Sequence, residues 1–156
     1  MTIHIRKAAL DDSVHVYRLM CGLEDELLDE GSFRQVYEAN LGSAHCFYWV
    51  AEAGKEIIGF ISLHIQQLLH YCGAVGEIQE FYIDKGFRRK GIGRLLINKV
   101  EQCAQARDVK SLEVTSSKKR AENVKVYERL GFKLIHNKFT TCIPVMNEHH
   151  SKEYKI

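Results

Sequence analysis

The stretch from residue 76 to residue 115 constrains the fold of this chain more than any other. GEIQEFYID predicts a strand, RRKGIGR follows it as a basic loop with two glycines, and RLLINKVEQCAQA and SLEVT predict a helix and a second strand. A strand–helix–strand unit joins parallel strands through a right-handed crossover. We therefore expect a sheet with at least one parallel pair.

The segments on either side of this unit indicate antiparallel pairing. CFYWVAEA (46–53) and IIGFISLHI (57–65) predict two strands, and the short turn AGKE between them predicts a hairpin. The other expected elements are a strand near residues 3–5, helices after Asp11–Asp12 and capped by Ser32, a helix over 120–130 ending at Gly131, and one or two strands within 132–143. The predicted fold class is α/β (α+β), with a mixed, mostly antiparallel twisted sheet flanked by helices on both faces.

Composition limits the functional classes. The 156 residues suit a single domain, expected over 1–146, followed by a polar C-terminal tail, NEHHSKEYKI (147–156). Charge is nearly balanced, with 22 Lys+Arg against 20 Asp+Glu, so neither nucleic acid nor a membrane is an expected partner. Five scattered cysteines without a CxxC pair favour reduced thiols, and no apolar run approaches a membrane span. We expect a cytoplasmic protein.

The basic loop has the composition of an anion site. It is not a P-loop, because Ile92 follows the second glycine of the GxxxxG spacing where lysine is needed, and Leu96 replaces the third glycine of a dinucleotide fingerprint. Glycines let backbone N–H groups approach an anion, and a helix N-terminus adds partial positive charge. A diphosphate would suit this loop.

Two motifs resemble the GNAT superfamily of N-acetyltransferases. The first is residues 77–93 with RxxGxG at Arg88, Gly91 and Gly93, and the second is YERLGF at 127–132. The resemblance implies acetyl-CoA as cosubstrate, with its pyrophosphate on the loop and its pantetheine arm along the preceding strand. The implied cofactor-binding residues are Phe81, Tyr82, Ile83, Arg88, Arg89, Lys90, Gly91, Ile92, Gly93 and Arg94, together with Asn123, because Arg120 stands where many members have asparagine.

Acetyl transfer by direct attack in a ternary complex needs an acid and a base. An alkylamine has a pKa of about 10, so a base must take its ammonium proton before it can attack. By resemblance, Glu77 is the expected base, Glu80 a second carboxylate or substrate contact, and Tyr127 the acid that protonates the leaving thiolate. Alternation along a strand places Glu77 and Glu80 on opposite faces unless a bulge brings them together.

Segments outside the cofactor loop suggest the acceptor. SLHIQ (62–66), GEIQE (76–80) and FRQVYEANL (33–41) resemble bacterial aminoalkylphosphonate N-acetyltransferases. Such a substrate carries both an ammonium and a phosphonate, and the expected acceptor contacts are Arg34, His64, His70 and Glu80. The association of that family with a divalent metal ion implies His64, His70 and Glu77 as candidate ligands.

Other functions stay open at this level. The acceptor could be another small amine, such as a polyamine or an aminoglycoside, held by the acidic cluster Glu24, Asp25, Glu26, Asp29 and Glu30. A non-catalytic acyl-CoA-binding module is a further alternative. The expected partners are a small-molecule amine and acetyl-CoA, and the sequence leaves a homodimer open.

Overall fold

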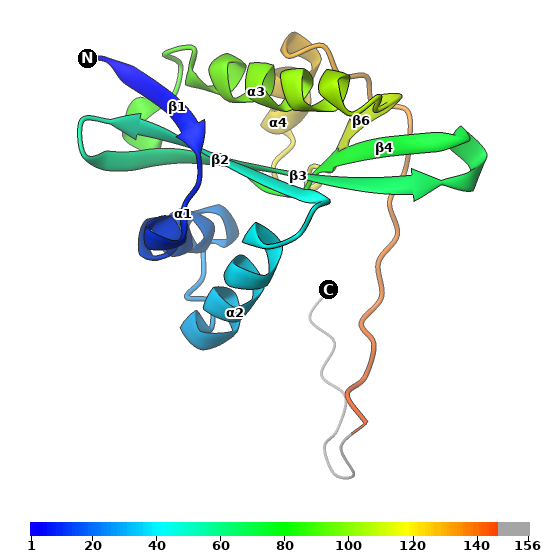
Figure 1. The fold of residues 1–156 in the computed structure, drawn as a ribbon, viewed down its shortest axis with the longest axis horizontal. Helices are drawn as coiled ribbons and strands as arrows, with labels where there is room; N and C mark the ends of the chain where they lie inside the picture. The colour runs from blue at the N-terminus through cyan, green and yellow to red at the C-terminus, as the bar shows by residue number, and fades with distance from the viewer. Residues whose placement is uncertain (147–156) are drawn as a thin grey trace.

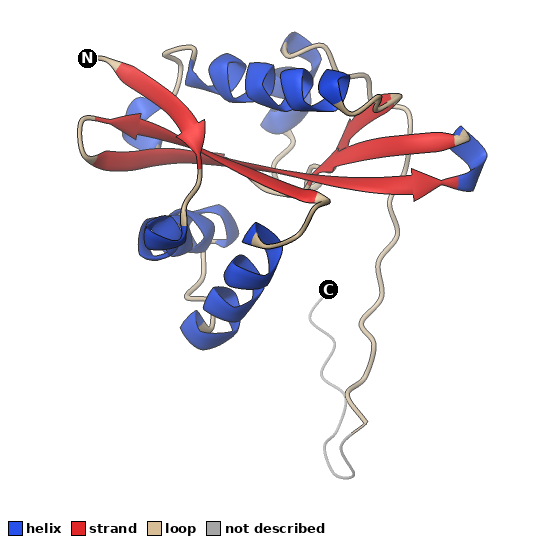
Figure 2. Ribbon diagram, in the orientation of Figure 1, coloured by secondary structure: helices blue, strands red, loops and turns tan. Residues whose placement is uncertain are grey.

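A mixed sheet with helices on both faces forms the body of the protein, as the computed structural model of residues 1–146 shows (Figures 1 and 2). The elements in chain order are β1 (Ile3–Lys7), α1 (Ser13–Glu24), α2 (Glu30–Leu41), β2 (Cys46–Ala53), β3 (Glu56–Leu68), β4 (Gly73–Ile78), β5 (Phe81–Ile83), α3 (Ile92–Ala106), β6 (Ser111–Val114) and α4 (Glu122–Arg129). The predicted tail, 147–156, lies outside the described residues.

The strand order is β1-β2-β3-β4-β6, with β5 paired to β3 beside this path. All pairs are antiparallel except β4 with β6, which α3 connects as the expected parallel crossover. The predicted fold class is therefore confirmed. In residues 1–146 no helix is both long and apolar enough to cross a membrane.

Each face of the sheet carries its own hydrophobic core. In Figure 2, α3 and α4 lie above the sheet and α1 and α2 below it. The apolar residues of α3 recur at helical spacing and are buried against the upper face: Ile92, Leu96, Ile97, Val100 and Ala104. The lower core joins α1 and α2 to β2 and β3, and it includes Tyr37, Tyr48 and Phe60.

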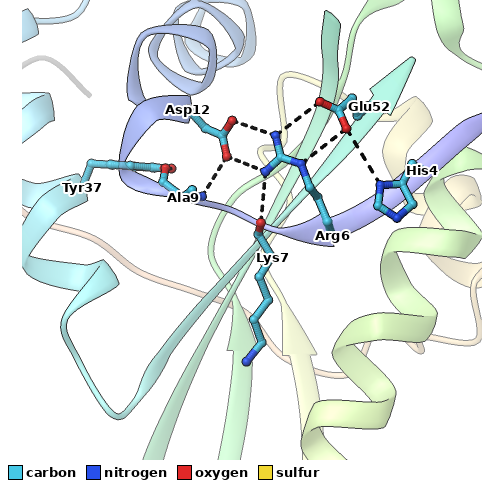
Figure 3. Close-up of polar contacts among 7 residues, drawn as sticks. All are labelled: His4, Arg6, Lys7, Ala9, Asp12, Tyr37 and Glu52. Atoms are coloured by element: carbon cyan, nitrogen blue, oxygen red, sulfur yellow. Dashed lines mark hydrogen bonds and ion pairs between the residues drawn. The ribbon is translucent and has the colours of Figure 1, made fainter. Parts of the chain in front are cut away.

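A polar network fastens β1 to the start of α1 (Figure 3). The Arg6 guanidinium donates to both carboxylate oxygens of Asp12, at 2.7 and 2.9 Å, and reaches Glu52 at 3.4 Å. The main-chain N–H of Ala9 also donates to Asp12, and the Tyr37 hydroxyl donates to the carbonyl of Ala9, which adds α2 to the network. The hydrogen bonds from Arg6 hold the pKa of Asp12 below its ordinary value.

Two details of the sequence prediction were wrong. Ser32 does not cap α2: the N-cap is Asp29, whose side chain accepts a hydrogen bond from the N–H of Ser32 at 2.7 Å. Nor do residues 132–143 form a strand within the described chain, because they leave the sheet edge and find no pairing neighbour. Gly131 has a φ of 99° and turns the chain at the end of α4, as its position predicted.

Candidate active site

A gap opens where two neighbouring strands separate. β4 pairs with β6 as far as Ile78 and Val114, but β5, which continues from β4, pairs with β3 alone among the described strands. The hydrogen bonds of Glu80 and Asp84 point toward β3. Because main-chain groups alternate along an antiparallel strand, those of residues 81 and 83 point into the gap. A bound chain could pair with them there.

The glycine loop delivers the start of α3 to the same gap. Arg89 and Gly91 adopt left-handed conformations, with φ of 61° and 80°, and α3 begins immediately afterwards. The first N–H to bond along the helix is that of Leu95, which donates to the carbonyl of Gly91. The N–H groups of residues 92–94 therefore have no helical acceptor, and they carry the positive end of the helix dipole.

Close packing and charge complete the loop. A Cβ on Gly93 would lie 3.3 Å from the Phe81 ring, so glycine lets α3 approach β5. The loop also presents exposed cationic side chains: Arg88, Arg89, Lys90 and Arg94. Of these, Arg88 donates to the carbonyl of Ile83 at 2.8 Å and Arg94 to that of Arg129 at 3.0 Å. The free N–H groups of α3 remain available for an anion.

A one-residue bulge brings the two candidate carboxylates to one face. His64 of β3 lies opposite Glu77, and the N–H of Ser62 donates to the carbonyl of Glu80. The three residues from Ser62 to His64 on β3 therefore lie opposite four residues, from Glu80 back to Glu77, on the neighbouring segment. One extra residue on one of two paired strands is a β-bulge. Since Ser62 and His64 share a face, Glu77 and Glu80 both lie on the side of α1 and α2.

Glu80 is oriented by a buried hydroxyl. Ser62 is fully buried, and its Oγ accepts from the N–H of Glu80 at 3.0 Å and donates to Glu80 Oε2. The carboxylate lines a cavity of about 190 Å³ between α1, α2 and β3, whose other walls are Val16, Met20, Leu23, Glu24, Leu28, Phe33, Val36, Tyr37 and Phe60. Two carboxylates and no cation line this cavity among the described residues, so it suits an ammonium group.

Glu77 has different surroundings. Its Oε1 accepts from Lys138 Nζ at 3.2 Å and from Thr115 Oγ1 at 3.3 Å, and it does not line the cavity. A carboxylate that accepts from a lysine ammonium and from a hydroxyl already has part of its charge compensated. The two glutamates therefore share a face but differ in access to the cavity.

Tyr127 of α4 packs between the aromatic rings of β5 and of the residue that follows the helix. Its ring centroid is 6.3 Å from that of Phe81 and 6.1 Å from that of Phe132, which anchors the end of α4. Burial raises the pKa of the Tyr127 phenol, and the nearby Arg120 guanidinium lowers it in part. The phenol thus keeps its proton at neutral pH and can donate it. Asn123 lies one helical turn earlier on α4.

The predicted acceptor contacts do not all reach the cavity. Arg34 is exposed on α2, where it pairs with Glu38 at 3.1 Å, and it does not line the cavity. His64 lies beside Cys46, with 3.4 Å between Nδ1 and Sγ, while its buried Nε2 has no partner among the described residues. The substrate contacts of both residues stay predictions.

The expected metal site is not formed by the described chain. His70 lies in the turn between β3 and β4, packed on the ring of Tyr71, four register pairs beyond the pairing of His64 with Glu77. Within residues 1–146 no three His, Cys, Asp or Glu side chains come close enough to hold a metal ion. The described residues do not bring the three predicted ligands together, because the hairpin carries His70 to the far end of β3 and β4 while His64 and Glu77 lie opposite each other.

Two residues of the site were missed in the sequence. Ser62 was recognisable only as one hydroxyl inside an apolar strand. Arg120 had a clearer signal, because it replaces an asparagine that is common in the family. Its guanidinium donates to the carbonyl of Leu23, at the end of α1, and Leu23 lines the cavity. Arg120 therefore brings a positive charge to the end of α1, beside a residue that lines the cavity.

One family match covers the separated strands, the N-terminus of α3 and the adjoining cavity. The sequence model described as the acetyltransferase (GNAT) family matches residues 11–132. The chain belongs to this family. It is an acetyl-CoA-dependent N-acetyltransferase, as the strand–glycine loop–helix unit had indicated.

The proteins similar to this GNAT chain differ in sequence identity, and only the more similar ones bear on its function. The aminoalkylphosphonate N-acetyltransferase of Salmonella typhimurium strain LT2 is 34% identical over 139 residues, which cover 89% of this chain and 90% of that protein. The structure of a protein described as a transcriptional regulator from Bacillus halodurans C-125 has a TM-score of 0.83 at 23% identity, covering 91% of this chain and 100% of that one. An aminoglycoside N-acetyltransferase in complex with CoA has a TM-score of 0.81 at 20% identity, covering 90% and 93%. At such identities the two structures show the fold alone.

Proposed function

We propose that this enzyme transfers acetyl from acetyl-CoA to the primary amine of a small aminoalkylphosphonate, by direct attack in a ternary complex. The observation that carries the proposal is the 34% identity to an aminoalkylphosphonate N-acetyltransferase across 89% of the chain. That span includes elements on both sides of the gap. A cavity with carboxylates at its wall supports an amine as the attacking group.

The donor would lie in the gap between β5 and β6. Its pyrophosphate would accept from the N–H groups of residues 92–94, with the loop cations adding attraction. The pantetheine arm would pair with the main chain of residues 81 and 83, which requires Arg88 to release the Ile83 carbonyl that it now holds. The main-chain N–H of Phe81, on this edge, would donate to the oxyanion of the tetrahedral intermediate.

The acceptor amine would enter the cavity as an ammonium ion. Glu80 takes one proton from it, and the free amine attacks the acetyl carbonyl carbon as the new C–N bond forms. The C–S bond then breaks, and Tyr127 donates its proton to the departing thiolate. The acylated nitrogen gives up its second proton as the amide forms, and this proton returns the Tyr127 phenolate to the phenol. We assign the base to Glu80 in preference to Glu77, because Glu80 lines the cavity while Glu77 is bonded to Lys138 and Thr115.

The phosphonate end needs a cation outside the cavity, since none lines its walls. Arg120 suits this role because its guanidinium already lies at the end of α1, where it bonds only to the Leu23 carbonyl among the described residues. The phosphonate would replace or share that carbonyl. In this arrangement the two ends of the acceptor meet charges of opposite sign.

The rival class of acceptor is a polycation such as a polyamine or aminoglycoside. Of the five acidic residues that could have held one, Glu24 lines the cavity and Asp29 instead caps α2. A polycation would therefore meet two carboxylates, Glu24 and Glu80, beside apolar walls. Two carboxylates are too few to compensate an acceptor that carries several ammonium groups.

The test is a panel of amines assayed with acetyl-CoA by release of the free CoA thiol. We expect kcat/KM for 2-aminoethylphosphonate to exceed that for 2-aminoethanol and for 1,4-diaminobutane by at least tenfold. Equal or higher values with the plain amines would refute the phosphonate assignment. In parallel, Glu80→Gln should lower kcat by about 10²- to 10⁴-fold. Glu77→Gln, the matched control, should change it by less than tenfold, and the reverse order would return the base to Glu77.

A further inference from the structure

The cavity beside Glu80 is larger than an unbranched acceptor needs. It has a volume of about 190 Å³ and opens between α1 and α2, which lie below the sheet in Figure 1. An apolar cavity of about 150 Å³ is sufficient to hold a benzene ring. The amine end of a two-carbon chain is much smaller than such a ring, so most of the space beside Glu80 is left for another part of the acceptor.

The interior of the cavity is apolar apart from Glu80 among the described residues. Its deepest side chains include Val16, Met20 and Phe60, which are no more than 6% exposed. The hydroxyl of Tyr37 already donates to a main-chain carbonyl at 2.7 Å, which leaves its ring to line the cavity. Water finds few hydrogen-bonding partners in such a space, so an apolar group is the favoured occupant.

The lining residues nearer to solvent are also mostly apolar. Leu23, Leu28 and Phe33 are half-buried, and Val36 is 59% exposed. The second carboxylate, that of Glu24, is exposed at the last position of α1. A group that occupied the cavity would cover the exposed parts of these apolar side chains, and the removal of that surface from water would stabilise the complex.

Contacts outside the cavity hold its walls in place. The Tyr17 hydroxyl donates to the carbonyl of Leu28 at 2.8 Å, which ties α1 to the connection that precedes α2. The Phe33 ring packs edge-on against Tyr17, with ring centroids 5.3 Å apart, and stacks on Tyr37 at 5.9 Å. The walls are therefore fixed without the acceptor, and a ligand that fits them loses little free energy to ordering the protein.

We propose that the preferred acceptor carries an apolar substituent of about four to six carbons on the carbon that bears the amine, and that this substituent fills the cavity. Because Glu80 is part of the wall, an amine in contact with it brings that carbon to the cavity. The phosphonate would stay outside, at Arg120. The inference rests on the proposed function and narrows its substrate class to branched aminoalkylphosphonates.

The first test compares 2-aminoethylphosphonate with derivatives that carry an isobutyl, phenyl or naphthyl group on the carbon bearing the amine. Each buried methylene contributes a factor of about four in affinity. The isobutyl and phenyl compounds should therefore exceed the unbranched one at least tenfold in kcat/KM, mainly through a lower KM. The naphthyl compound should lose this gain, because two fused rings exceed the cavity. An isobutyl compound no better than the unbranched one, or a naphthyl compound that keeps the full gain, would overturn the proposal.

A pair of amines without phosphonate separates this inference from the proposed function. In 2-amino-4-methylpentan-1-ol the same isobutyl group is attached to 2-aminoethanol, and kcat/KM should again rise at least tenfold. If phosphonates have no advantage over these alcohols but the isobutyl gain appears in both pairs, the proposed function fails and the apolar substituent is supported. If phosphonates are preferred and isobutyl gives no gain in either pair, the proposed function is supported and this inference fails.

The second test changes the wall of the cavity. Leu28→Asn/Val36→Thr replaces apolar groups by polar ones of nearly the same shape, at positions that are not fully buried. The ratio of kcat/KM for the isobutyl phosphonate to that for the unbranched one should fall at least fivefold. Val14→Thr/Leu27→Asn is the matched control, because these residues are 65 and 87% exposed and do not line the cavity, and it should keep the wild-type ratio. An unchanged ratio in the first variant, or an equal fall in both variants, would contradict the proposal.

Discussion

Replacing Ser62 by alanine is expected to slow catalysis while leaving the fold almost unchanged. The hydroxyl is fully buried and contacts Glu80 twice, through the main-chain N–H at 3.0 Å and through Oε2. Alanine keeps the side-chain volume nearly constant and removes only the oxygen. The carboxylate then loses the donor that sets its orientation toward the cavity.

The expected size of the effect follows from the charge of the acceptor oxygen. A hydrogen bond to a charged group contributes about 1.5–3 kcal/mol. If this orientation is needed in full at the transition state, kcat/KM falls by about 10- to 160-fold, since 1.36 kcal/mol corresponds to a factor of ten. The melting temperature should fall by only a few degrees, because one hydrogen-bonding group is lost.

The assay is CoA thiol release with the preferred acceptor, for Ser62→Ala, Glu80→Gln and the double variant. If the hydroxyl acts through the carboxylate, removing it should cost less than about twofold once Glu80 is already glutamine. Ser13→Ala controls for the loss of a buried serine that does not line the cavity. A Ser62→Ala enzyme within twofold of wild type, or an equal loss in both backgrounds, would refute the reasoning.

Three further substitutions probe the acid, the fold and the loop. Tyr127→Phe should lower kcat at least tenfold. The Kd of acetyl-CoA, measured by calorimetry, should stay within twofold of the wild-type value. An unchanged kcat would show that the phenol takes no part in the reaction. Asp12→Asn should reduce the free energy of unfolding by about 2 kcal/mol at pH 7, because it breaks the largely buried pair with Arg6. Since Arg6 lowers the pKa of Asp12, this stabilisation is present above about pH 4 and is lost as the pH falls through the lower folded pKa. Urea melts from pH 7 to pH 2 should thus converge for wild type and variant, and a constant difference would contradict the assignment. Gly91→Ala, at a φ of 80°, should cost about 1–2 kcal/mol and weaken acetyl-CoA binding several-fold, whereas Gly86→Ala in the preceding turn should do neither in the same two assays.

Local patterns in the sequence were sufficient for most of the architecture. The bounds of β2 and the C-terminal end of α3 agree with their hydrophobic periodicity, and the parallel crossover follows from the order of strand, helix and strand. The cosubstrate followed as well, because RxxGxG and YERLGF are short contiguous motifs that resemble those of the family. In each case the signal and the structure that it specifies lie within a few residues of each other.

The acceptor side depended on the tertiary structure. The resemblance favoured Glu77 over Glu80 as the base, but a single extra residue between them places both on one face, and of the two only Glu80 lines the cavity. The same applies to Arg120, whose contact with Leu23 spans 97 positions, and to His70, which the hairpin carries away from His64. One inserted residue reverses which way every following side chain points, and distant contacts form only when separate elements pack. The strand expected after α4 was missing for a related reason, because residues 132–143 leave the sheet without lying along one of its edges, and local pattern does not decide that course.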